Sequence, residues 1–68
     1  MKIAAYMDLL TSSQSARDEF RADAEAAMIK FGLNEQERAV VATRDSAKIR
    51  AEVAKVDPNR AKALRITF

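Results

Sequence analysis

Side chains that can begin a helix recur at short intervals along this chain of 68 residues. Ser15, Asp23, Asn34 and Asp45 each carry a side-chain oxygen that can accept a hydrogen bond from a free amide at a helix start. Asp57-Pro58 follows them, and the residue before a proline is pushed out of the helical conformation. Because these signals follow one another closely, no helix can be long. We therefore expect a compact set of short helices.

Between these signals, apolar residues recur at the spacing of one helical face. The pattern predicts helices over about residues 2–10, 15–22, 24–31, 35–44 and 46–56, whereas residues 59–65 can form one or two helical turns or extend. The expected fold is an all-α small bundle of four to five short helices with an extended C-terminal tail. The side chains expected to point inward are Ile3, Tyr6, Met7, Leu10, Phe20, Met28, Phe31, Ile49, Val53 and Val56.

The segment "FGLNEQE" is the clearest helix-to-helix corner. Gly32 is the only glycine, and it stands where a helix can end in the left-handed conformation without a Cβ penalty. Leu33 can then fold back onto the last turn, and Asn34 with Glu37 forms a capping pair for the next helix. We interpret Gly32, Leu33 and Asn34 as structural residues.

The chain lacks the side chains on which most catalytic sites depend. It contains neither cysteine nor histidine, so the usual metal ligands, the thiol nucleophile and a Ser-His pair are all missing. Ser12, Ser13 and Ser15 lie together, but without a histidine base they are interpreted as capping residues. We predict no catalytic residue, no metal site and no cofactor bound by this chain.

The size and hydropathy of the chain indicate a small soluble protein that works with a partner. A single core of this size gives marginal stability, which favours association with another molecule. No apolar run approaches the ~20 residues of a membrane span, and Asp8 interrupts the apolar N-terminus. The absence of cysteine fits a cytoplasmic protein. We expect a cytoplasmic location and no membrane contact.

Positive charge is concentrated in the C-terminal third. Residues 1–47 carry a net charge of −2, and residues 48–68 carry +4. Lys48, Arg60 and Arg65 are therefore candidate contacts to a partner, and nucleic acid or an acidic protein is one alternative. However, Lys48, Glu52 and Lys55 alternate in sign along one helical face, as solvated helices commonly do. We therefore do not expect nucleic acid to be the partner.

The chain stops on "ALRITF", which reads as an extended segment. Its last residues are β-branched and aromatic, a composition typical of strands. Two placements are open: Leu64, Ile66 and Phe68 are presented to a partner, or Ile66 and Phe68 pack into the protein's own core or a dimer interface. We accordingly divide the chain into a helical body, residues 1–56, and a tail, residues 57–68.

Residues 17–49, "RDEFRADAEAAMIKFGLNEQERAVVATRDSAKI", resemble the LigA-type domain, the small helical α subunit of certain extradiol ring-cleaving dioxygenases. The resemblance implies a non-catalytic subunit beside a larger chain that holds the catalytic iron. In the dioxygenase subunits, a Gly-Gly-Asn and aromatic-rich segment commonly follows, whereas this chain continues "AEVAKVDPNRAKALRITF". The residues that carry the resemblance are Phe20, Asp23, Glu25, Ala26, Phe31, Gly32, Leu33, Glu37, Arg44 and Asp45.

The domain also resembles the leader or recognition domain of split borosin precursors, which are ribosomally made peptides (RiPPs). In those proteins a helical domain binds a separate α-N-methyltransferase, which methylates a C-terminal tail with S-adenosylmethionine. This resemblance implies a heteromeric complex with a methyltransferase, with Leu64, Ile66 and Phe68 as candidate modified residues. We take this precursor function as the first hypothesis and the dioxygenase-type subunit as its alternative.

Overall fold

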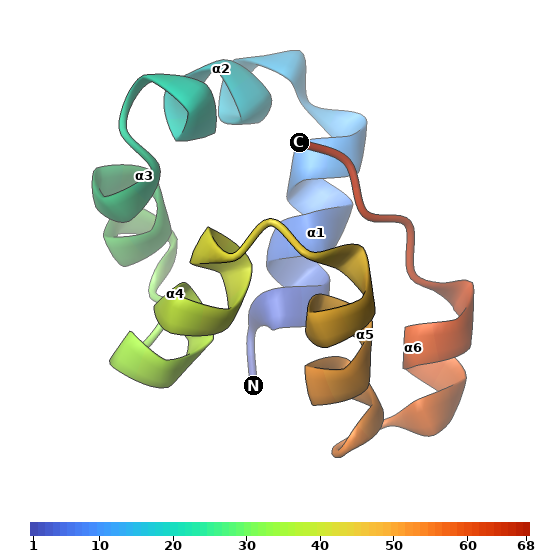
Figure 1. Cartoon of the computed structure of the whole chain (residues 1–68). Coiled ribbons are helices and arrows are strands. Elements are labelled where there is room, and N and C mark those ends of the chain that lie inside the picture. Colours follow the sequence, from blue (N-terminus) through green and yellow to red (C-terminus); the bar gives the residue numbers. More distant parts are fainter.

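The computed structural model describes all 68 residues, and the fold is entirely helical. Helix α1 lies in the middle, with α2, α3 and α4 on one side and α5 and α6 on the other (Figure 1). The molecule measures about 30 × 24 × 18 Å. The six helices are α1 (Ile3–Ser12), α2 (Gln14–Ala22), α3 (Ala24–Phe31), α4 (Glu35–Ala42), α5 (Ser46–Ala54) and α6 (Pro58–Ala63).

This architecture confirms the all-α prediction, with six helices where four to five were expected. Residues 58–63 are helical because Pro58 occupies the first turn, where its missing amide costs no hydrogen bond. The Asp57 side chain accepts from the amide of Arg60 and caps this helix. The residues that follow α6, 64–68, are not helical.

The predicted capping residues begin three of the helices. The side chain of Asp23 accepts from the Ala26 amide, and that of Asp45 accepts from two amides of α5. Asn34 and Glu37 form a reciprocal capping box at the start of α4. The prediction of Ser15 as the cap of α2 is wrong. Ser13, whose backbone is extended, accepts from the Ala16 amide instead, so α2 begins two residues earlier than the Ser15 cap would place it.

Gly32 forms the expected corner between α3 and α4. Its φ angle is +101°, in the left-handed region. The Leu33 amide donates to the Met28 carbonyl at 3.0 Å, and the Gly32 amide donates to Met28 and Ile29, the pattern of a Schellman motif. Leu33 is buried beside this turn. The corner therefore closes α3 and redirects the chain into α4.

One apolar core joins all parts of the molecule. Phe20 and Met28 are buried as expected, whereas Phe31 is half-buried and packs at the edge of the core. Val56 contradicts its expected inward placement: it lies beyond the end of α5 and is 67% exposed. The core residues are Ile3, Tyr6, Met7, Leu10, Phe20, Met28, Leu33, Val41, Ile49, Val53, Ala61 and Leu64.

Two acidic side chains are buried at the contacts between helices. Glu37 accepts from the Lys2 amide at 2.6 Å and from the Asn34 amide at 2.9 Å, and so joins the start of α4 to the start of α1. Burial by itself raises the pKa of Glu37. The two amide hydrogen bonds and the positive charges of the N-terminus and Lys2 outweigh it, so the pKa lies below its ordinary value.

Glu52 was expected on a solvated face, but only 5% of its surface is exposed. Its carboxylate lies 2.8 Å from the Lys55 ammonium and accepts from the Gln36 side chain at 3.4 Å. The Lys55 hydrogen bond lowers the pKa of Glu52, against the opposing effect of burial. Glu52 therefore pairs with Lys55 along the chain and also contacts Gln36 of α4.

The C-terminal tail lies against the body, and its side chains alternate. Leu64 is buried in the core, while Ile66 and Phe68 are half-buried and pack against it. Arg65 and Thr67 between them are exposed. From α6 the tail runs back to the junction of α1 and α2 (Figure 1). Of the two placements left open by the sequence, this is the one in which the tail packs onto the protein's own core.

Candidate interaction surface

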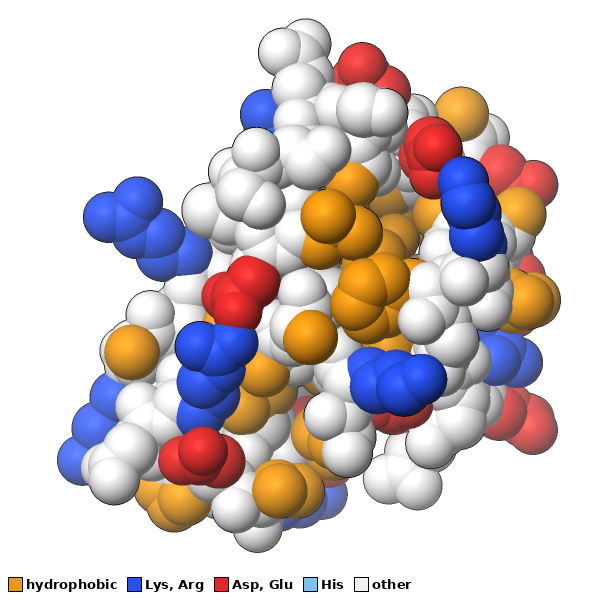
Figure 2. Space-filling model, turned by 180° about the vertical axis from the view of Figure 1, so that it is seen from behind, with side chains coloured by type: hydrophobic (Ala, Val, Ile, Leu, Met, Phe, Trp, Pro, Cys, Tyr) orange, Lys and Arg blue, Asp and Glu red, His pale blue; other side chains and the backbone are white.

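One face of α1 is apolar and open to solvent. Ala5 and Leu9 lie one turn apart on the same face of α1, and Met1, in the segment just before the helix, lines a hollow together with Ala5. All three are exposed: Met1 by 58% and Leu9 by 36%. Figure 2 shows apolar side chains gathered along the middle of this side of the molecule, with charged side chains at the rims. We call Met1, Ala5 and Leu9 the α1 stripe.

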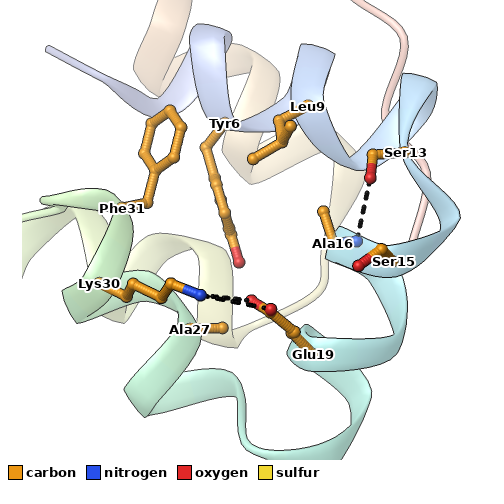
Figure 3. A pocket seen from close by; sticks show the side chains of 9 residues that line it. All are labelled: Tyr6, Leu9, Ser13, Ser15, Ala16, Glu19, Ala27, Lys30 and Phe31. Atoms are coloured by element: carbon orange, nitrogen blue, oxygen red, sulfur yellow. Dashed lines mark hydrogen bonds and ion pairs between the residues drawn. The ribbon is translucent and has the colours of Figure 1, made fainter.

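A hollow of about 280 Å³ opens at one end of this stripe, between α1, α2 and α3. Leu9 and Phe31 form part of its apolar wall, and the Tyr6 ring lies between them (Figure 3). Glu19 of α2 and Lys30 of α3 form an ion pair of 3.3 Å across it. The Tyr6 hydroxyl points toward this pair (Figure 3).

The Tyr6 hydroxyl is buried without a hydrogen-bond partner. Only 2% of Tyr6 is exposed, and its oxygen is the one buried side-chain polar atom of the chain that makes no hydrogen bond. Burial, and then the negative charge of Glu19, raise the pKa of this hydroxyl. It is therefore protonated at neutral pH and can donate a hydrogen bond.

A second hollow, of about 290 Å³, lies at the other end of the stripe. Met1, Ala5 and Val56 contribute to its wall, and Arg60 lies at its edge. Arg60 of α6 also forms an ion pair with Asp8 of α1. The Asp8–Arg60 ion pair thus borders the stripe on the side of α6, and the Glu19–Lys30 ion pair borders it on the side of α3. Each pair joins one acid to one base, so neither carries a net charge.

The three basic residues predicted as partner contacts do not share one hollow. Lys48 lies beside a separate shallow hollow between α4 and α5, where Val40 and Lys55 are neighbours. Arg60 is paired with Asp8 as described above. Arg65 is exposed on the tail, and its carbonyl accepts from the Thr11 hydroxyl at 3.3 Å.

Several other arginines hold the helices together. Arg17 donates to the Leu10 and Thr11 carbonyls at the end of α1. Arg38 donates to the Leu33 carbonyl at 2.7 Å and Arg50 to the Ala61 carbonyl. The Arg17 hydrogen bonds thereby satisfy carbonyls in the last turn of α1. Several of the basic side chains in the sequence therefore stabilise the fold by hydrogen bonds to backbone carbonyls.

The tail is fixed by contacts to its side chains and carbonyls. The Phe68 ring stacks on the Phe20 ring at 5.6 Å between centroids, and the Arg44 guanidinium lies 4.9 Å from the Phe20 centroid. Arg21 donates to the Phe68 carbonyl at 2.8 Å. In contrast, the amides of residues 65–68 donate no backbone hydrogen bond.

The structure contains no group of three or more acidic, cysteine or histidine side chains arranged to hold a metal ion. None of the six helices has the length and apolar character that crossing a bilayer requires. The fold and the surface together define a small six-helix domain whose most distinctive feature is the exposed α1 stripe with a hollow at each end.

The sequence matches the family model described as the LigA subunit of the aromatic-ring-opening dioxygenase LigAB, over residues 4–54. This match covers three quarters of the chain, so the chain belongs to the LigA family. It ends at Ala54, the last residue of α5, and α6 and the tail lie outside it. No curated protein and no solved structure matches the chain.

Two features of this surface are missing from the sequence-based prediction. The spacing of Met1, Ala5 and Leu9 is visible in the sequence. A stronger apolar pattern in the same segment indicates the inward face of the helix, and it consists of Ile3, Tyr6, Met7 and Leu10. The unsatisfied Tyr6 hydroxyl has no such signal, because it depends on how α2 and α3 close around the ring.

Proposed function

We propose that this protein is a non-catalytic small subunit that docks onto the catalytic subunit of an aromatic-ring-opening dioxygenase. Membership of the LigA family is the observation that carries this proposal, because the matching family model is named for one subunit of a ring-opening dioxygenase. The larger subunit would supply the catalytic iron, the substrate pocket and the chemistry. The small domain would supply binding surface and stability to the complex.

The packed tail supports this proposal over a free, presented terminus. Leu64 is as well buried as the helical core residues, and Phe68 stacks on Phe20. Releasing the tail would therefore expose apolar surface of both tail and body to water. A docking subunit works with a closed, compact fold and needs no released segment.

Co-expression with the ring-opening dioxygenase catalytic subunit encoded in the same genome tests the proposal. We expect the two chains to co-purify at a fixed stoichiometry, and the small chain to raise the ring-opening rate or the stability of its partner. A catalytic subunit that is fully active and stable, and that binds none of this chain, would exclude this function.

A second candidate function is that of a precursor whose tail is backbone-methylated by a partner enzyme carrying S-adenosylmethionine. One observation favours it: the amides of residues 65–68 donate no backbone hydrogen bond, and methylation requires free amides. Leu64, Ile66 and Phe68 remain the proposed modified residues. Their side chains first have to leave the body, and the Leu64 amide, which donates to the Ala61 carbonyl at 3.4 Å, also has to give up that hydrogen bond. The methyltransferase would bind the helical domain and receive the tail in extended form.

Incubation with a methyltransferase encoded beside the gene, followed by tandem mass spectrometry, tests this second function. We expect each methylation to add the mass of one methylene group to a fragment of the tail. A tail that stays unmodified by an enzyme active on its own substrate would exclude it. Because neither outcome depends on ring opening, the two candidate functions can be distinguished.

A further inference from the structure

We propose that the α1 stripe and the hollow beside Tyr6 are the docking site for the catalytic subunit, which inserts an apolar side chain next to a hydrogen-bonding group that pairs with the Tyr6 hydroxyl. This inference rests on the proposed dioxygenase-subunit function and names the surface through which the small subunit binds the catalytic one. The partner segment is apolar at its centre and carries little net charge.

The Tyr6 hydroxyl is the observation that points to an occupant. A buried hydroxyl without a hydrogen bond destabilises the folded chain relative to one that has a partner. Phenylalanine would fill the same space beside Phe20 and Phe31 without this cost, since it lacks only the oxygen. The hydroxyl thus lowers the stability of the isolated chain. A partner that completes its hydrogen bond recovers this loss on binding.

The α1 stripe supplies the apolar area around that hydroxyl. Met1, Ala5 and Leu9 are exposed in a row, and Val56 adds a further apolar side chain, 67% exposed, at the far end. The inward face of α1 packs the core, so the helix is apolar on two sides. An apolar surface of this kind on a small domain is typical of a protein-binding site.

The ion pairs at the rims define the charge of the partner. Asp8 is paired with Arg60, and Glu19 with Lys30, so neither rim offers an excess of one sign. A strongly charged segment could only exchange one of these ion pairs for another, with no net gain in ion pairs. The favoured partner segment is therefore apolar, with polar groups at its edges, as in the centre of protein interfaces generally.

Three variants test this surface by calorimetric titration against the purified catalytic subunit. Ala5→Arg places a charge in the middle of the stripe at an exposed helical position. Tyr6→Phe removes only the hydroxyl. Ala42→Arg is the matched control, because Ala42 is also exposed and helical but lies on α4, outside both hollows.

We expect Ala5→Arg to weaken binding by at least about ten-fold. Tyr6→Phe is expected to raise the unfolding midpoint of the isolated chain and to weaken binding by about ten-fold, a combination that a purely structural residue would not produce. Ala42→Arg should bind like the unaltered chain. A complex that forms equally well with Ala5→Arg, or with Tyr6→Phe, overturns this docking site and leaves the proposed function standing. A wild-type chain that does not bind the catalytic subunit overturns both.

Discussion

Glu37 is a buried charged residue that links the start of α4 to the start of α1. Its carboxylate accepts one hydrogen bond from the amide of Asn34, the cap of α4, and one from the amide of Lys2, just before α1. Charge-assisted hydrogen bonds of this kind are stronger than those between neutral groups. Because the hydrogen bonds favour the ionised form, the pKa of Glu37 is lower in the folded chain than in the unfolded one.

We expect Glu37→Gln to lower the free energy of unfolding at neutral pH by about 1–2 kcal/mol, because two amides lose a charged acceptor. The sign of the pH effect follows from the lowered pKa. The stabilisation is complete above the unfolded pKa of about 4.5 and is lost as the pH falls through the lower folded value.

Urea unfolding of both chains between neutral and acidic pH measures this effect. The loss of stability on acidification should be smaller in Glu37→Gln than in the unaltered chain. Equal slopes in the two chains would show that Glu37 does not contribute through its charge. Glu35→Gln is the matched control, since Glu35 is exposed at the first position of the same helix.

The corner between α3 and α4 depends on one backbone angle. Gly32 has a φ of +101°, which side-chain-bearing residues rarely adopt. A Cβ at this position would lie 3.0 Å from the Lys2 ammonium, which belongs to a flexible side chain and can move away. The cost of a substitution is therefore mainly the backbone conformation.

We expect Gly32→Ala to destabilise the fold by about 1–2 kcal/mol, the cost of a left-handed conformation for an L-residue. Gly32→Asn should cost less, because asparagine tolerates this conformation better. Thermal unfolding followed by circular dichroism measures both. If alanine and asparagine shifted the midpoint equally, the backbone angle would not explain the need for glycine.

Element boundaries illustrate what can be predicted from this sequence. The caps at Asp23, Asn34 and Asp45 and the corner at Gly32 are local, so their chemistry is visible in a few adjacent letters. The choice between Ser13 and Ser15 is not, because both serines can cap a helix and the adjacent letters do not distinguish them. Glu52 was misplaced for a similar reason: its buried position depends on Gln36 in another helix.

At the scale of the whole molecule, the tail completes the core. Leu64 joins the buried cluster, and Phe68 covers Phe20, which has Arg44 nearby. The sequence indicates that residues 66–68 are extended, but not whether they leave the body, since an apolar strand suits either a partner or the protein itself. The contacts with Thr11, Arg21 and Phe20 favour attachment, and they link residues far apart in the chain.

We expect Phe68→Ala to lower the free energy of unfolding by about 1–2 kcal/mol, because it removes the stacked ring and uncovers Phe20. Chemical denaturation measures the change, and Lys62→Ala is a suitable control because Lys62 is exposed on α6 and forms no ion pair. A Phe68→Ala chain as stable as the control would mean that the tail adds nothing to the fold in solution.

Tyr6 has a practical consequence for following these events in solution. The chain contains one tyrosine and no tryptophan, so its near-ultraviolet emission comes from a single ring at the wall of the hollow between α1, α2 and α3. The intensity of that emission responds to the groups that surround the phenol. The protein thus carries its own optical reporter, in which filling of the hollow or opening of the fold can be followed without attaching any dye.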